Sequence, residues 1–190
     1  MAEQSAARQA ARSAAAAARK ALGDAERAAA NAAICARLIA IAEERDAKVI
    51  LSYRAFAGEV DLTGFHDWCR ETGRALAFPV TYGKGRMEAW LPLEDDAWEV
   101  DRYGILMPQI SRSRLIEPQE LELVAAPCVA FDAQRNRMGW GGGYYDRYLP
   151  QCRKALKLAV AFECQRSEEP LDVQSWDVPL ERIITDARIY

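Results

Sequence analysis

The chain has 190 residues, of which 51% are hydrophobic, and a formal net charge of −3. This length allows one α/β domain with a sizeable core but not two full domains. The slight acidic surplus argues against a nucleic-acid-binding protein, and no apolar run reaches the roughly twenty residues of a membrane span. The five cysteines include no C-x-x-C pair. They fit reduced thiols, so we expect a cytoplasmic protein.

An alanine-rich segment opens the chain. Alanine is the strongest helix former, so this composition predicts a helix from Ser5 to about Leu22. Gly23 and Asp24 are expected to end that helix and to cap a second one, which continues to about Glu44. The two segments together predict an N-terminal helical hairpin.

The hydrophobic pattern then changes to short apolar runs that are typical of strands. A helix over Asp61–Thr72 separates the first two runs. Near-continuously apolar strands that alternate with helices predict a three-layer α/β fold, with a mostly parallel sheet and helices on both faces. We expect residues 1–190 to form a single domain. The predicted strands are VILSY (49–53), ALAFPV (75–80), MEAWL (87–91), LVAAPCVAF (123–131), LKLAVAF (156–162) and RIIT (182–185).

Ligands of such sheets bind at the carboxyl ends of the strands, where we expect Glu59, Asp132 and the glycine-rich segment described below. The segment Tyr82–Arg86, YGKGR, is expected to be a hairpin turn rather than a second phosphate loop. His66 is the only histidine. We expect it to be a partly exposed helix residue, because most zinc and Ser-His-Asp sites would lack their other parts.

The segment 136–149, NRMGWGGGYYDRYL, is the most informative motif. Glycine backbone can direct its N–H groups toward an anion, and the helix expected from Tyr144 adds a favourable dipole. Arg137 and Arg147 flank the loop as charged donors, and Asp146 suits a divalent cation beside a phosphate. The spacing matches neither the Walker A loop nor the dinucleotide-binding loop. From the glycines alone, an ordinary tight loop is about equally plausible.

The same segment resembles the signature R-L-G-x-G-x-G-Y-Y-D-R-x-L of 5-formyltetrahydrofolate cyclo-ligases. Further matching motifs follow the family's order over nearly the whole chain: two basic residues four apart in the first helix, YRAFAGEVDLT, FPV, YGILMP, APCVAFD and SWDVPLERIIT. The resemblance implies an enzyme that uses ATP and Mg²⁺ to convert 5-formyltetrahydrofolate into 5,10-methenyltetrahydrofolate, with release of ADP and phosphate. It also implies a phosphorylated formyl intermediate and no covalent nucleophile.

The resemblance implies an ATP site that combines the first helix with the glycine loop. From the residues alone, Arg8 and Arg12 lie one turn apart on one helix face, and a solvated face is the plainer interpretation. The family usually has a lysine where this chain has Arg8. The expected ATP-binding residues are Arg8, Arg12, Arg137, Gly139, Trp140, Gly141, Gly142, Gly143, Tyr144, Tyr145 and Arg147.

The resemblance also implies that Asp146 and Asp177 bind Mg²⁺ and that Glu59 contacts the pterin ring. Without it, the plainer interpretation of Asp177 is a turn residue before a proline-containing loop. For Glu59, an N-cap or first-turn charge of the following helix is about equally plausible. Arg54, Tyr103 and Tyr144 complete the expected substrate site. Arg54 stands where relatives often have an apolar residue that faces the pterin.

The expected partners are the small molecules ATP and 5-formyltetrahydrofolate, with neither nucleic acid nor membrane, in a monomer or weak homo-oligomer. Two alternatives stay open. A folate-sequestering protein would need Glu59 and aromatic contacts but neither the glycine loop nor the two metal carboxylates. An ATP-dependent enzyme for another pterin or amide would keep the loop, and Arg54 would be its best indication.

Overall fold

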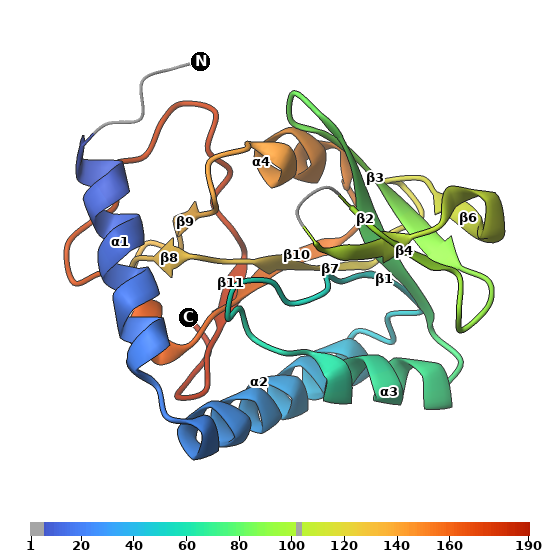
Figure 1. The fold of residues 1–190 in the computed structure, drawn as a ribbon, viewed down its shortest axis with the longest axis horizontal. Helices are drawn as coiled ribbons and strands as arrows, with labels where there is room; N and C mark the ends of the chain where they lie inside the picture. The colour runs from blue at the N-terminus through green and yellow to red at the C-terminus, as the bar shows by residue number, and fades with distance from the viewer. Residues whose placement is uncertain (1–5, 102–103) are drawn as a thin grey trace.

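The computed structural model describes residues 6–101 and 104–190, and Figure 1 presents their ribbon. The strands are β1 Val49–Leu51, β2 Ala75–Gly83, β3 Arg86–Pro92, β4 Trp98–Val100, β5 Leu106–Pro108, β6 Ser113–Ile116, β7 Leu123–Pro127, β8 Ala130–Phe131, β9 Arg137–Met138, β10 Leu156–Val160 and β11 Arg182–Ile184. Seven of them form the main sheet in the order β11-β10-β7-β1-β2-β3-β6. The first five in this order run parallel, and β3 and β6 continue the sheet antiparallel. The predicted α/β class is confirmed.

Four α-helices and three short 3₁₀ turns are present among the described residues. They are α1 Ala6–Ala21, α2 Asp24–Glu44, α3 Thr63–Glu71 and α4 Tyr144–Tyr148, with η1 Ile110–Arg112, η2 Leu149–Gln151 and η3 Glu163–Gln165. The first three helices match the predicted ranges closely. The Glu26 carboxylate accepts a hydrogen bond of 3.0 Å from the Gly23 amide and so caps α2.

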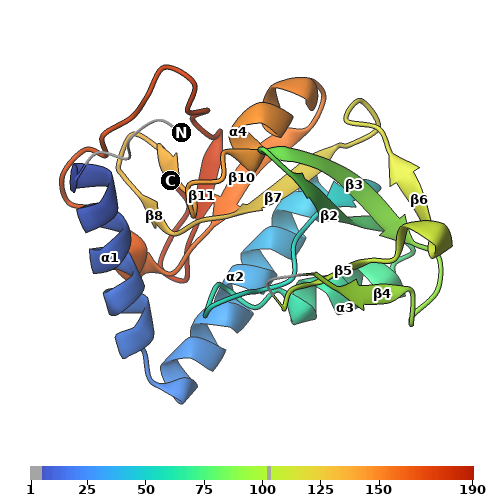
Figure 2. The ribbon, with the colours of Figure 1, turned by 45° about the horizontal axis from the view of Figure 1, so that its top comes forward.

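Helices α1 and α2 meet at a sharp corner and then run apart, as Figures 1 and 2 show. Helix α2 lies with α3 on one face of the sheet, whereas α4 lies on the other. Helix α1 instead packs over η3 and β8, beyond the carboxyl ends of the parallel strands. This position leaves one side of α1 facing the segments that follow β1 and β9.

The sheet is buried on both faces, which explains the continuously apolar strands. Ile50 points into the core beneath α2 and α3, and the adjacent Leu51 points into the core beneath α4. Leu158 and Ala159 in β10 divide between the two cores in the same way. Successive strand side chains face opposite sides, so a two-sided core requires apolar residues at every position.

The structure differs from the predicted strands in two places. LVAAPCVAF is not one strand: β7 ends at Pro127, and residues 130–131 pair with β9 in a separate hairpin. The side chain of Gln165 holds the departing chain by donating to the carbonyls of Cys128 and Val129, at 2.8 and 2.7 Å. Strands β4, β5 and β6, which are short and partly exposed, and the two-residue strand β9 are also present but were not predicted. The YGKGR turn does form the expected β2–β3 hairpin.

His66 and Asp132 are both buried, which the sequence did not indicate. His66 is buried, with 7% of its surface exposed, so the expectation of a partly exposed histidine is wrong. Its Nε2 lies 2.8 Å from the Ser52 hydroxyl oxygen. Asp132 is 1% exposed, and its carboxylate accepts four hydrogen bonds from residues 134, 136 and 171. Asp132 therefore stabilises the turn that connects β8 with β9.

Candidate functional site

The site is built where α1 crosses the glycine loop. The β8–β9 hairpin places residues 139–143 between β9 and α4, and the turn after β1 lies nearby. Arg12 Nε donates a hydrogen bond of 2.8 Å to the Gly139 carbonyl, which joins residues 127 positions apart. Arg12 is 7% exposed, so the interpretation of its position as part of a solvated helix face is wrong. Burial, with a smaller contribution from Arg8, lowers the pKa of Arg12.

Arg8 and Asp177 form the second connection between α1 and the C-terminal part of the chain. Arg8 Nη1 lies 2.5 Å from the Asp177 carboxylate and 2.6 Å from the Asp172 carbonyl. Asp177 also accepts a hydrogen bond of 2.8 Å from the Gln174 amide. Burial acts to raise the pKa of Asp177, but the hydrogen bonds from Arg8 and Gln174 outweigh it and lower that pKa.

Arg137 and Asp146 form the corresponding pair on the loop side. Arg137 Nη2 donates 2.8 Å to the Asp146 carboxylate, and its Nε is buried without a hydrogen-bond partner among the described residues. The guanidinium also lies 5.5 Å from the Tyr145 ring centroid. The Tyr145 hydroxyl is buried, and burial raises its pKa. Tyr145 thus points inward, while its neighbour Tyr144 packs over the loop.

The glycines leave room for the side chains that pack over the loop, and Gly143 also has a positive φ. Gly143 has φ of +65°, and a Cβ there would lie 2.5 Å from Arg147 Nη1. A Cβ on Gly142 would lie 2.6 Å from the Tyr144 ring. Arg147 Nη1 instead donates to the Gly143 carbonyl at 2.9 Å, so this side chain fastens the loop from outside.

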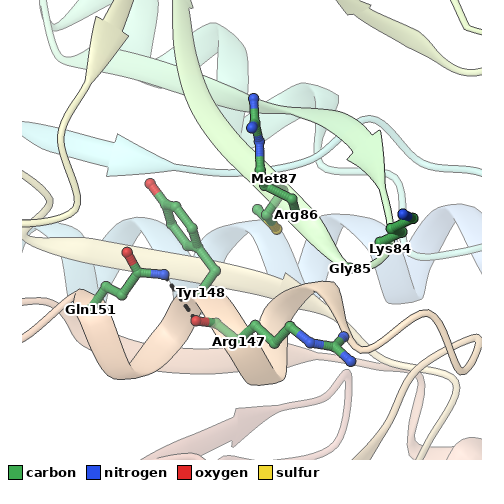
Figure 3. A pocket seen from close by; sticks show the side chains of 7 residues that line it. All are labelled: Lys84, Gly85, Arg86, Met87, Arg147, Tyr148 and Gln151. Atoms are coloured by element: carbon green, nitrogen blue, oxygen red, sulfur yellow. Dashed lines mark hydrogen bonds between the residues drawn. The ribbon is translucent and has the colours of Figure 1, made fainter.

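A cavity of about 170 Å³ lies between the β2–β3 turn and the segment of α4 and η2 that follows the loop. Figure 3 shows the Arg147 guanidinium extending toward Lys84 and Gly85, with Arg86 on the adjoining strand. A Cβ on Gly85 would lie only 2.0 Å from Arg147 Nη1, so glycine is needed here for Arg147 to reach the loop. The predicted hairpin turn therefore also supports the loop.

Glu59 lies in the turn after β1 and faces the loop. Its Oε1 accepts 2.9 Å from Trp140 Nε1, and its Oε2 accepts 3.1 Å from the Phe56 amide. Burial raises the pKa of Glu59, although these two donors and Arg19 oppose the shift. Trp140, which is 51% exposed, therefore contributes its indole to Glu59 rather than to the core.

Arg54 stacks on two aromatic rings beside this turn. Its guanidinium carbon lies 4.3 Å from the Trp98 ring centroid and 5.0 Å from that of Phe78. Its Nε is buried without a hydrogen-bond partner in residues 6–101 and 104–190. This arrangement provides a cationic, aromatic wall. Tyr103, the remaining expected substrate residue, lies outside the described residues.

The comparison with protein families agrees with these features. The family model described as the 5-formyltetrahydrofolate cyclo-ligase family matches residues 4–186. The chain belongs to this family. A 5-formyltetrahydrofolate cyclo-ligase of Haemophilus influenzae is 32% identical over 146 residues, which cover 75% of this chain and 78% of that protein. The Escherichia coli K12 cyclo-ligase is 27% identical over 76% of this chain and 81% of its own length.

Solved structures support the family's fold. The NMR structure of 5,10-methenyltetrahydrofolate synthetase from Aquifex aeolicus has a TM-score of 0.82 and 27% identity, and the match covers 96% of this chain and 91% of that one. The Mycoplasma pneumoniae synthetase has a TM-score of 0.75 at 24% identity, covering 94% and 98%, and supports the fold alone. This cyclo-ligase family member is accordingly a ligase with the fold described above.

The two aspartates expected to bind Mg²⁺, Asp146 and Asp177, do not belong to a preformed metal cage within residues 6–101 and 104–190. No group of three or more metal-ligating side chains occurs among the described residues of this family member. Magnesium commonly uses one or two carboxylates together with phosphate oxygens and water. Asp146 and Asp177 could supply such carboxylates, and their partners in the structure are Arg137 and Arg8. Within the described part of the chain, no helix has the length and apolar character of a membrane span.

Sequence reasoning missed one buried cation of this cyclo-ligase family member. Arg19 is 3% exposed and donates 2.7 Å to the Ala57 carbonyl, in the turn that carries Glu59. The available signal was its spacing: Arg12, Ala15 and Arg19 recur at helical intervals and form the buried face of α1. An arginine at such a position is easily taken for a solvent-exposed residue in an alanine-rich helix.

Proposed function

We propose that the protein converts 5-formyltetrahydrofolate into 5,10-methenyltetrahydrofolate, with ATP as co-substrate and Mg²⁺ as cofactor. The observation that carries this proposal is the contact between Arg12 and the Gly139 carbonyl. It joins the basic face of α1 to a glycine loop, so that cationic side chains and backbone amides, which both bind phosphate, lie together. Membership of the cyclo-ligase family supports the folate substrate.

In the proposed reaction, the formyl oxygen attacks the γ-phosphorus of ATP, and ADP leaves. N10 of the folate then attacks the activated formyl carbon and loses its proton to solvent, and the bond between that carbon and the phosphate oxygen breaks, so that phosphate departs. Both steps depend on positioning and on charge stabilisation rather than on a protein nucleophile. Arg8, Arg12 and Arg137, with the loop amides, would bind the phosphates. Asp146 and Asp177 would hold Mg²⁺, which supplies charge neutralisation when bound.

Glu59 would orient the pterin by accepting N–H groups from its aminopyrimidine edge. Trp140 would remain beside that carboxylate, and Arg54 with Tyr144 would line the rest of the pocket. The Arg54 guanidinium can face the polar edge of the pterin or its formyl oxygen, because two aromatic rings already hold it in place. In this way a cation would replace the family's usual apolar contact.

The test is absorbance in the methenyl-folate band after mixing protein with 5-formyltetrahydrofolate. ATP and Mg²⁺ are each present or omitted. A rise that requires all components supports the proposal. Folate-dependent ATP hydrolysis without a rise would instead favour another pterin substrate. Folate binding without ATP use would favour a sequestering protein, and both of these outcomes would refute the proposed reaction.

A further inference from the structure

A second basic cavity lies in the corner between α1 and α2. Its volume is about 380 Å³, and Arg19, Lys20 and Arg27 line it together with Trp140 and the Ala57–Gly58 turn. No acidic side chain is among its lining residues. Arg8 and Arg12 do not line the cavity: they lie nearer the start of α1, where Arg8 contacts Asp177 and Arg12 contacts Gly139. None of its three cations has a role in the proposed ATP site.

Arg19 is the central cation of this cavity. Nη2 donates to the Ala57 carbonyl, whereas Nη1 is buried and has no hydrogen-bond partner in the described chain. The side chain is 3% exposed, and burial lowers the pKa of Arg19. A buried guanidinium nitrogen without an acceptor is unfavourable, because it has lost water and gained nothing in return.

Arg27 and Lys20 add further positive charge beside Arg19. Arg27 donates 2.7 Å to the Arg19 carbonyl and 3.2 Å to the Gly58 carbonyl, so it is held against the same turn. Among the described residues, Arg19, Lys20 and Arg27 form no ion pair. Glu59 attracts Arg19, but the attraction gives Arg19 Nη1 no hydrogen-bond acceptor among the described residues. An added anion would relieve both the repulsion and the missing acceptor.

Trp140 gives the cavity an aromatic wall. The Arg19 guanidinium carbon lies 5.6 Å from the Trp140 ring centroid, which fixes the cation beside the indole. The other groups of a ligand can pack on this half-exposed ring. The features together select a ligand with a negatively charged oxygen group next to a planar or apolar part.

We propose that this cavity is an oxyanion subsite, in which Arg19 donates to a carboxylate or phosphate oxygen of a substrate. Lys20 and Arg27 supply further positive charge, and Trp140 packs against the adjoining part of the ligand. The choice of ligands rests on the proposed function. The glutamyl carboxylates of the folate and the phosphates of ATP both carry this chemistry.

The experiment uses Arg19→Gln and Lys20→Glu, with Lys154→Glu as the matched control. Lys20 and Lys154 are both exposed, and Lys154 precedes the amino end of β10, whereas α1 lies beyond the carboxyl ends of the parallel strands. Calorimetry measures the dissociation constants of 5-formyltetrahydrofolate, of an analogue without the glutamyl group, and of ATP. We expect both cavity variants to weaken binding of one ligand by about tenfold or more, and the control to match wild type.

The pattern of losses identifies the source of the oxyanion. A defect with 5-formyltetrahydrofolate that disappears with the shortened analogue assigns the subsite to the glutamyl carboxylates. A defect confined to ATP assigns it to phosphate. Unchanged affinities in both cavity variants overturn the proposal, as does an equal change in Lys154→Glu. If Arg19→Gln fails to fold, Lys20→Glu decides alone. Calorimetry measures binding without turnover. Failure of the oxyanion subsite can therefore be told apart from failure of the proposed reaction, which the absorbance test measures.

Discussion

The indole Nε1 of Trp140 donates a hydrogen bond of 2.9 Å to Oε1 of Glu59, across 81 positions of sequence. This bond connects the proposed phosphate loop with the proposed pterin carboxylate. Glu59 is 8% exposed, so each donor around it contributes to keeping the carboxylate ionised. If the loop moved and displaced Trp140, the pKa of Glu59 would therefore rise.

Replacing Trp140 with phenylalanine should raise the pKa of Glu59 further, because one of the donors that lower it is removed. A carboxylate with a higher pKa loses its charge at a higher pH. The acid limb of kcat/KM for the folate should therefore move upward in pH, which a pH profile measures. Trp90→Phe is the control, since Trp90 Nε1 donates 3.2 Å to Glu88 outside the site. If the acid limb did not move, the ionisation of Glu59 would not control kcat/KM for the folate.

Glu59→Gln should raise KM for the folate more than KM for ATP. The amide keeps one oxygen for the Phe56 amide, but its NH₂ group opposes the Trp140 donor and cannot accept from the pterin. Loss of a charged acceptor predicts a decrease of about tenfold to a hundredfold in kcat/KM for the folate. Steady-state kinetics with each substrate varied in turn measures this split. A defect in ATP alone would contradict the placement of Glu59.

Asp146→Asn should decrease turnover by about a hundredfold and raise the Mg²⁺ concentration needed for half-maximal rate. The change also leaves Arg137, which is 7% exposed, without its carboxylate, so unfolding in urea should show a stability loss of about 3 kcal/mol. Asp67→Asn is the control: Asp67 pairs with Arg70 on the exposed side of α3. Unaltered Mg²⁺ dependence would remove Asp146 from the metal site.

Gly143→Ala should raise KM for ATP, whereas Gly73→Ala, which introduces the same backbone strain, should not. Gly143 and Gly73 have nearly the same φ, +65° and +68°, but a Cβ on Gly73 meets nothing within 4 Å. Alanine at either position should cost about 1 kcal/mol of stability. Only at Gly143 does the methyl group displace Arg147 from the loop carbonyls, which should raise KM for ATP by about tenfold. Equal KM values in the two variants would contradict this role of Arg147.

Stability should fall as the pH decreases from about 6.5 to 4. Burial, followed by the Arg54 charge, lowers the pKa of His66 from 6.5 to about 4. Between these values the unfolded chain binds the proton and the folded chain does not, so protons favour unfolding by up to about 3 kcal/mol. Urea unfolding at several pH values measures the effect. His66→Gln removes the titrating ring and should flatten this part of the profile, whereas an unchanged slope would assign it to carboxylates.

Local sequence patterns determined much of the fold. Alanine-rich composition and Gly23 defined α1 and α2, and continuous apolar runs defined the central strands, because burial on both faces removes polar positions from a strand. The YGKGR turn followed from its glycines. Edge strands such as β6 were missed because an exposed strand of a few residues needs no continuous apolar run.

The tertiary structure alone decided which polar groups meet. Nothing local in the sequence joins Arg12 to Gly139 or Trp140 to Glu59, since these contacts depend on sheet order and on where α1 crosses the strand ends. The same holds for His66, which is buried because it packs against β2. It also holds for Arg19, because only the packing of the Ala57 turn against it shows that Nη2 has an acceptor and Nη1 has none. Periodicity specifies which side of an element is buried, whereas long-range packing selects the partners of the buried charges.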